Sequence, residues 1–278
     1  MVLIFTDLAL AEVSAFIGSR QPECGGALLG IPDSNLITKF IPDPEATVSG
    51  ASYFPSNELT GEVQELEKRT EVEFKGIVHS HPGGLDHPSG QDLNAFKLGL
   101  DLNRRLRAFV GPIVTLDRAA RVDSSGELPV GEGGRLRGFL AFRSGQDYPP
   151  VELVPVRCTA MPINTHMVEL QTRLGGEGQK LAEDLSWGYL TVIGTLFMSA
   201  TLQSTNCEVV VLFPPTYPTT KPTVLFTTAK EGPTRELEFS WGLPIPKPKS
   251  LWEFCGASLL AALDVKEGEG NEPTDIGA

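Results

Sequence analysis

Residues 76–92 have the sequence GIVHSHPGGLDHPSGQD, which contains three of the four histidines of the chain. Residues 72–78, VEFKGIV, lead directly into the first two histidines and predict a strand that ends there. After Asp92, apolar residues recur at helical spacing, so a helix is expected next. A strand, a histidine-rich loop and a helix in this order point to a metal site.

The predicted strand directs His79 and His81 to the same side. Side chains alternate along a strand with a period of two, so Ser80 faces the other way. Asp92, in the first turn of the predicted helix, can reach back toward the pair. Three protein ligands leave the fourth position of a tetrahedral zinc ion open for water, which is typical of a catalytic site. The pKa of such a water is lowered to about 7.

Each part of this pattern also has a simpler structural explanation. His-x-His pairs are common by chance, and Ser89 followed by Asp92 is an ordinary helix N-cap with an acidic residue in the first turn. His87 is expected to be a loop residue. Cys24 is expected to be packed rather than reactive, because the sequence offers it no partner base.

Composition argues against several classes of function. The chain has 278 residues, enough for two domains, and 41% of them are apolar. A net charge of −12 would repel phosphate backbones and anionic lipid, so neither nucleic acid nor a membrane is expected as a partner. No apolar run approaches the roughly 20 residues that cross a bilayer, and no signal peptide is evident. The four cysteines form no CxxC pair, which favours a reducing cytoplasm.

The first half of the chain alternates strands with helices, which predicts an α/β or α+β domain. One helix is expected to begin at an N-cap, Thr6, and to end near Gly18. The other expected helices are Glu58–Thr70 and Leu93–Leu106, and the expected strands are Val2–Phe5, Ala27–Gly30, Ile37–Ile41, Val72–His81, Phe109–Leu116 and Leu136–Phe142.

A polar, proline-containing stretch over residues 143–155 predicts a domain boundary near residue 158. Domains are therefore expected over 1–157 and 158–265, with a disordered acidic tail over 266–278. The second domain should contain helices at Thr165–Leu174 and Leu251–Leu263, with strands at Leu190–Ala200, Glu208–Phe213 and Thr223–Thr227.

The spacing of the histidine run matches a known signature. A His-Ser-His-Pro motif begins at His79, a Ser-x-x-Asp motif begins at Ser89, and seven residues separate His81 from Ser89. This resembles the JAMM signature of the JAB/MPN metalloprotease family, over about residues 1–157. The resemblance implies one catalytic Zn²⁺ bound by His79, His81 and Asp92. It also implies a cytidine-deaminase-like mixed sheet flanked by helices.

The same family places a glutamate upstream, in a segment of the form Glu-x-x-Gly-x-Leu-x-Gly. Residues 23–30 of this chain are ECGGALLG. The resemblance implies that Glu23 is the general base, which takes a proton from the zinc-bound water and delivers it to the leaving amine. It implies that Ser89 supports the oxyanion while also capping its helix. Without the resemblance, a lone glutamate before a strand would be read as a surface residue.

The second half carries a proline-rich loop, FPPTYPTTKPTVLF, over residues 213–226. Its prolines fix φ and remove backbone donors, which predicts a rigid connection between neighbouring strands. The loop resembles a segment of ubiquitin-conjugating enzymes, which implies an α+β domain with an antiparallel meander. A working conjugating enzyme needs a cysteine after this loop, but none lies between Cys207 and Cys255. We expect Cys255 to be a small buried side chain and the domain to be non-catalytic.

Together, the resemblances imply a deubiquitinase-like zinc isopeptidase that removes a ubiquitin-like modifier from an amine or matures its precursor. The second domain would bind the ubiquitin-like protein, its conjugates or a conjugation enzyme. The fusion also suggests a bacterial ubiquitin-like pathway, such as one in antiviral defence. Two alternatives stay open: a non-catalytic scaffold of such a pathway, and a peptidase acting on a sulfur-carrier protein or small peptide.

Overall fold

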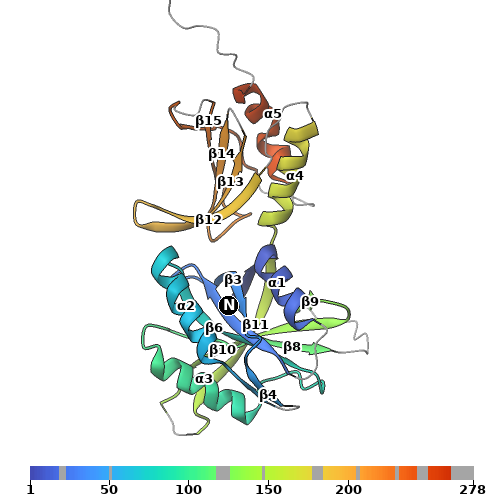
Figure 1. The fold of residues 1–278 in the computed structure, drawn as a ribbon, viewed down its shortest axis with the longest axis vertical. Coiled ribbons are helices and arrows are strands. Elements are labelled where there is room, and N and C mark those ends of the chain that lie inside the picture. The colour runs from blue at the N-terminus through green and yellow to red at the C-terminus, as the bar shows by residue number, and fades with distance from the viewer. Residues whose placement is uncertain are drawn as a thin grey trace, which may run out of the picture. The chain divides into compact units, whose positions relative to one another are not determined.

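Strand β6 (Glu73–His81), which ends at the histidines, lies inside a nine-stranded mixed sheet (Figure 1). The other strands of this sheet are β1 (Val2–Thr6), β2 (Gly25–Gly30), β3 (Leu36–Pro42), β7 (Phe109–Val110), β8 (Ile113–Leu116), β9 (Leu128–Val130), β10 (Gly134–Arg143) and β11 (Val151–Met161). The pairing order is β11-β1-β3-β2-β6-β7-β10-β8, with β9 added on β10. Because β10 also pairs with β11, the pairings form a closed ring. A separate hairpin joins β4 (Thr47–Ser49) to β5 (Ser52–Phe54).

This computed structural model describes residues 1–18, 23–49, 52–116, 126–145, 148–176, 184–204, 207–228, 232–242 and 250–263. The chain divides into two compact units. The first is Met1–Asn164 with Tyr189–Met198, and the second is Thr165–Gly188 with Ser199–Ala278. The predicted tail over 266–278 lies outside the described residues. Within the described residues, no helix combines the length and apolar character needed to cross a membrane.

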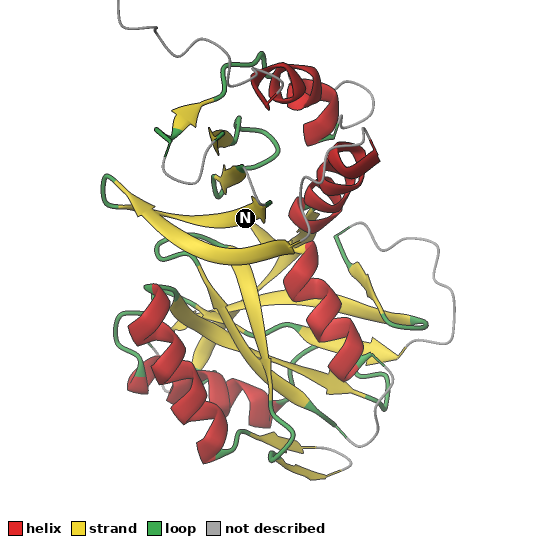
Figure 2. Cartoon of the chain, turned by 45° about the horizontal axis from the view of Figure 1, so that its top comes forward, coloured by secondary structure: helices red, strands yellow, loops and turns green. Residues whose placement is uncertain are grey.

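Three helices cover the sheet of the first unit, α1 (Asp7–Ile17), α2 (Asn57–Thr70) and α3 (Gly90–Leu102) (Figure 2). Each buries apolar residues spaced four apart, which places them on one helical face. These residues are Ala9, Val13 and Ile17 of α1, Leu59 and Val63 of α2, and Phe96 and Leu100 of α3. Thr6 accepts a hydrogen bond from Ala9 N at 3.2 Å, which confirms it as the N-cap of α1.

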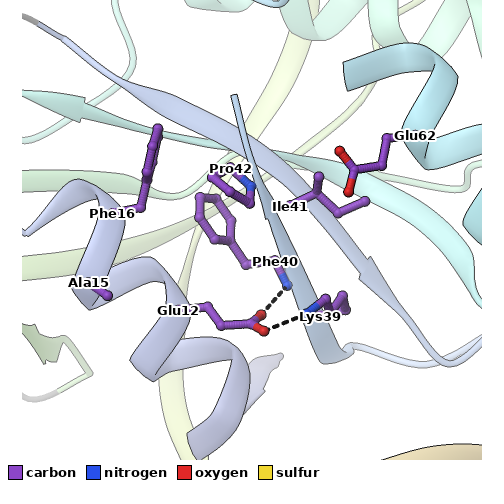
Figure 3. A pocket seen from close by; sticks show the side chains of 8 residues that line it. All are labelled: Glu12, Ala15, Phe16, Lys39, Phe40, Ile41, Pro42 and Glu62. Atoms are coloured by element: carbon purple, nitrogen blue, oxygen red, sulfur yellow. Dashed lines mark hydrogen bonds and ion pairs between the residues drawn. The ribbon is translucent and has the colours of Figure 1, made fainter. Parts of the chain in front are cut away.

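Glu12 connects α1 to β3 beyond the point where β3 stops pairing with β1. Strand β1 ends early and pairs with β3 only at Ile4↔Leu36 and Phe5↔Ile37. The Glu12 carboxylate instead accepts a hydrogen bond from Phe40 N at 3.1 Å and another from the Lys39 ammonium (Figure 3). A buried backbone donor is thereby satisfied by a side chain, as close packing requires. The groups line a cavity of about 370 Å³.

Most strands expected in the first half are confirmed, but the stretch Phe109–Leu116 is two strands rather than one. Gly111 and Pro112 interrupt it between β7 and β8. Proline cannot donate to a strand ladder, so the run breaks there despite its apolar character. The helix after Asp92 is also shorter than expected, because α3 ends at Leu102 with Asn103 as its C-cap.

Strand β11 carries the first unit through residue 158, where the sequence predicted a domain boundary. It pairs with β10 on one side and with β1 on the other, including Leu3↔Cys158. The prolines of this stretch lie before β11 or within it. Because β11 still pairs with both of its neighbours, these prolines do not mark a linker. The two units divide after Asn164 instead.

The second half contains helix α4 (Ile163–Gly176), helix α5 (Leu251–Leu263) and an antiparallel sheet. The strands, in their order across the sheet, are β12 (Asp184–Val192), β13 (Thr195–Gln203), β14 (Glu208–Phe213), β15 (Thr223–Thr227) and β16 (Arg235–Glu236). The prediction of one strand over Leu190–Ala200 was wrong. Ile193 and Gly194 have φ of 49° and 73°, so they form a two-residue hairpin turn between β12 and β13.

We expect Gly76→Ala to destabilise the first unit. Gly76 has φ of 153°, and a Cβ atom there would lie 1.9 Å from the Val110 carbonyl oxygen, a backbone atom that cannot move aside. The free energy of unfolding should fall by about 3 kcal/mol, measured as a lower midpoint in thermal unfolding of the full chain. The matched control is Gly61→Ala in α2, where a Cβ meets nothing within 4 Å. Helix propensity predicts an unchanged or slightly raised midpoint for that variant. Equal unfolding midpoints for the two variants would contradict the requirement for glycine at position 76.

Candidate metal centre

The structure brings His79, His81 and Asp92 together at the end of β6. The two Nε2 atoms of the histidines lie 3.1 Å apart. One Asp92 oxygen lies 3.1 Å from Nε2 of His79, and the other lies 3.4 Å from Nε2 of His81. Within the described residues, this is the group of three whose ligand atoms all lie close enough to hold one metal ion.

Local structure explains why these three side chains meet. Strand β6 pairs with β2 at Gly25↔His79 and with β8 at His81↔Thr115, which holds its end rigidly between two neighbours. Strand alternation then directs both imidazoles to one face. Asp92 is fixed by a capping box, in which Ser89 N donates to Asp92 Oδ2 at 2.6 Å and Asp92 N donates to Ser89 Oγ at 3.3 Å.

The three residues fit a tetrahedral zinc ion. Zinc bonds to nitrogen and oxygen of about 2.0–2.1 Å separate neighbouring ligand atoms by about 3.3–3.4 Å. The observed separations of 3.1–3.4 Å are close to that spacing. Two imidazole nitrogens and a carboxylate are also a donor set that zinc accepts, and three ligands leave one position open. The cluster can therefore hold a metal ion, as in the JAMM zinc site.

The electrostatics of the cluster favour a cation. Burial works to raise the pKa of Asp92, but hydrogen bonds from His79 and His81 outweigh burial and hold that pKa well below its usual range. Burial works to lower the pKa of His81, but its hydrogen bonds to Asp92 and to the Leu85 carbonyl outweigh burial and raise it. The Asp92 carboxylate is thus ionised, and a proton competes with a metal ion for the His81 imidazole.

His81 is oriented by the loop that follows it. Its Nδ1 lies 2.9 Å from the Leu85 carbonyl oxygen, which can only accept, so in the neutral ring Nδ1 carries the proton and Nε2 has a lone pair with which to bind a metal ion. The next loop residue, Asp86, pairs with Arg137 of β10, which also pairs with Glu127. These ion pairs hold the loop against the sheet.

Glu23 lies just before β2, opposite the histidine strand. The register Gly25↔His79, continued by two residues, sets Glu23 across from His81. Glu23 is 6% exposed, and burial raises its pKa, although the nearby His81 and His79 partly oppose that rise. Ser80 strengthens this placement, because its N donates to Cys24 O at 2.9 Å and its Oγ accepts from Cys24 N at 3.1 Å.

The other residues singled out in the sequence have ordinary roles. His87 lies outside the cluster, and its exposed ring pairs with Asp86 at 3.0 Å. Cys24 is partly buried and packs against the core cluster that includes Val13 and Ile17 of α1. Cys255 is fully buried, as expected, and burial raises the pKa of its thiol to about 12.

Sequence reasoning missed two residues beside the cluster, Tyr53 and Asp43. The Tyr53 ring stacks on His79, and its hydroxyl donates to Asp43 Oδ2 at 3.0 Å. Neither stands in a motif, and the contact joins segments that are distant in the sequence. Only the fold could reveal it.

Comparisons with known proteins place a domain on this part of the chain. Residues 14–122 match the family model Prok-JAB, described as prokaryotic homologs of the JAB domain. No curated protein matches the sequence. Among solved structures, the solution structure of protein DSY2949 from Desulfitobacterium hafniense is similar, with 18% identity and a TM-score of 0.40, over 59% of this chain and 97% of that one. A JAB domain with this His-x-His and Asp cluster is consistent with a JAMM metalloprotease.

We expect the purified chain to bind one zinc ion, and His81→Ala to lose it. Removal of one of three ligands should weaken binding by at least 100-fold, since the other two cannot complete the site. The measurement is zinc content after dialysis, together with affinity in competition with a chelator. His87→Ala is the control and should bind like the unaltered chain. Stoichiometric zinc in His81→Ala would contradict the assignment.

Zinc affinity should fall as the pH is lowered. Zinc binds the neutral imidazole, so once the pH drops below the raised pKa of His81, a proton must be displaced. Each displaced proton weakens binding by about tenfold per pH unit. Asp92, with its lowered pKa, stays ionised over the same range and adds no slope. Chelator competition between pH 8 and pH 5 tests this, and a constant affinity would refute it.

Proposed function

We propose that the chain is a zinc-dependent isopeptidase that removes a ubiquitin-like modifier from an amine or trims the modifier's precursor. The observation that carries this proposal is a buried glutamate placed beside a three-ligand cluster. Glu23 is buried and acts electrostatically with all three residues of the cluster, and His79, His81 and Asp92 have the spacing of a zinc site with one open position. A metal with a neighbouring base is the arrangement that amide hydrolysis needs.

Zinc bound at the cluster would supply a Lewis acid and lower the pKa of water. Glu23 then moves the proton. It accepts the proton as the water oxygen bonds to the amide carbon, and gives it to the nitrogen as the carbon–nitrogen bond breaks. Burial favours this task, because a carboxylate with a raised pKa holds a proton more readily than an exposed one.

Ser89 is proposed to support the oxyanion. Its Oγ accepts the hydrogen bond from Asp92 N, which leaves the hydroxyl proton to donate to a substrate oxygen. The same residue thereby orders the helix that carries Asp92 and serves the reaction. The cap makes Ser89 rigid, which suits a donor that must be in place before the charge develops.

The proposed substrate class rests on the second unit. The order α4, antiparallel sheet and α5 supports a relationship to ubiquitin-conjugating enzymes, as does the loop after β14. In that loop, Tyr217 is 3% exposed and lies against Phe213, with ring centroids 5.0 Å apart. Trp241 donates to the Pro218 carbonyl at 3.1 Å. A proline-rich loop held by an aromatic cluster is rigid enough to serve as a recognition element.

We propose that this unit binds its partner without catalysis. No cysteine occurs in the sequence between Cys207 and Cys255. Cys255 donates to the Leu251 carbonyl within α5, and a thiol with a pKa of about 12 is a poor nucleophile at neutral pH. The partner would be the modifier, its conjugate or a conjugation enzyme.

Glu23→Gln should abolish cleavage while leaving zinc bound. Loss of a positioned general base typically costs about 10²–10⁴-fold in rate. The substrates are ubiquitin-like modifiers carrying an aminocoumarin amide on the C-terminal glycine, with hydrolysis followed by fluorescence. Glu62→Gln, the same change at an exposed position of α2, is the matched control and should keep full activity.

Substrate cleavage and zinc content, measured together, separate the candidate functions. Full activity of Glu23→Gln, or of the unaltered chain after removal of zinc, would overturn the proposed mechanism. Stoichiometric zinc with no cleavage of any modifier by the unaltered chain would instead favour the scaffold. Cleavage of short peptides alone would favour a peptidase of small substrates.

A further inference from the structure

The two histidines of the cluster are held in different ways. His81 has a hydrogen bond on its outer nitrogen, from Nδ1 to the Leu85 carbonyl at 2.9 Å. Nδ1 of His79 is buried and has no hydrogen-bond partner among the described residues. A metal-binding histidine normally relies on such a bond to fix its ring, so another contact must orient His79.

Tyr53 supplies that contact. Its ring is nearly parallel to the His79 ring, with an angle of 10° between the planes and 6.0 Å between the centroids. Gly25, paired with His79 in the sheet, makes the close approach possible. A Cβ atom on residue 25 would lie 2.9 Å from the His79 Cβ and 3.0 Å from the Tyr53 Cζ. The imidazole therefore packs against an aromatic plane through a space that only glycine leaves.

Tyr53 is itself fixed by a buried carboxylate. Asp43 is 3% exposed and accepts three hydrogen bonds, from Tyr53 Oη at 3.0 Å, Ser56 N at 2.9 Å and Ser56 Oγ at 2.6 Å. Its own N donates to the Gly25 carbonyl at 3.1 Å. Asp43 thus ties the hairpin β4–β5 and the start of α2 to the strand end beside His79.

We propose that Tyr53 is the positioning residue of His79, and that Asp43 holds Tyr53 in that place. This inference rests on the proposed metal site. Tyr53 is not a ligand or a proton donor to substrate, because its hydroxyl is engaged by Asp43 while the ring face meets His79. In this account an aromatic plane does for His79 what the Leu85 carbonyl does for His81. Loss of the Tyr53 ring lets the His79 imidazole rotate and weakens metal binding, without removing a ligand.

The test compares zinc affinity in three variants on the same hairpin. Tyr53→Leu removes the plane, and Tyr53→Phe keeps the plane but releases it from Asp43. Phe54→Leu is the matched control, because Phe54 is 51% exposed and lies one residue further along the strand. Affinity is measured by chelator competition, the ligand field by the visible spectrum of the cobalt-loaded chain, and folding by the thermal midpoint without metal.

Tyr53→Leu should weaken zinc binding by about 10–100-fold, the range found when outer contacts of metal ligands are removed, and should alter the cobalt spectrum. Tyr53→Phe should fall between Tyr53→Leu and the unaltered chain, and Phe54→Leu should match the unaltered chain.

An affinity and spectrum of Tyr53→Leu equal to those of the unaltered chain would overturn the inference and leave the proposed function standing. The inference is also overturned, with the proposed function left standing, if Tyr53→Phe binds zinc normally and the zinc lost by Tyr53→Leu matches its loss of folded protein. Absence of zinc binding by the unaltered chain would overturn both. If the variants change zinc affinity as expected but the unaltered chain cleaves no modifier, the proposed function alone is overturned.

Discussion

The pairing of β6 between β2 and β8 is the constraint on which the candidate metal centre depends. It fixes the backbone of His79 and His81, and strand alternation then aims both imidazoles at one point. The same strand end holds the segment before β2, because Ser80 N donates to Cys24 O at 2.9 Å, and it keeps Glu23 close enough to act electrostatically with His81 and His79. The candidate ligands and the proposed base are therefore held by the same strand, and a shift of its register by one residue would turn the imidazoles away from Asp92.

Ser80 shows how the position between the ligands is used. It points away from the metal cluster and holds Cys24 through both its backbone and its side chain. Gly25 follows, and its missing side chain admits Tyr53 against His79. Three consecutive positions thus have different roles: Glu23 is the proposed base, Cys24 is bound to Ser80, and Gly25 leaves space for packing. Each depends on a different residue of β6 or of the hairpin.

The parts of the site that could be predicted from sequence are those set by local structure. The strand period placed His79 and His81 together, and the first turn of a capped helix carried Asp92 to them. The contact of Tyr53 with His79 could not be predicted, because it depends on the separate hairpin β4–β5, which is distant from His79 in the sequence. Similarly, Ile193 continues an apolar pattern, yet its positive φ makes it a turn. Strand β11 contains Pro155, part of the stretch that suggested a linker, yet the strand pairs with β1.

The central claim is that His79, His81 and Asp92 bind one zinc ion with an open position beside Glu23. X-ray absorption spectroscopy of the zinc-loaded chain tests it most directly. The account predicts four nitrogen or oxygen ligands at about 2.0–2.1 Å, with outer-sphere scattering from two imidazoles. A sulfur ligand at about 2.3 Å, or a spectrum without imidazole scattering, would contradict it.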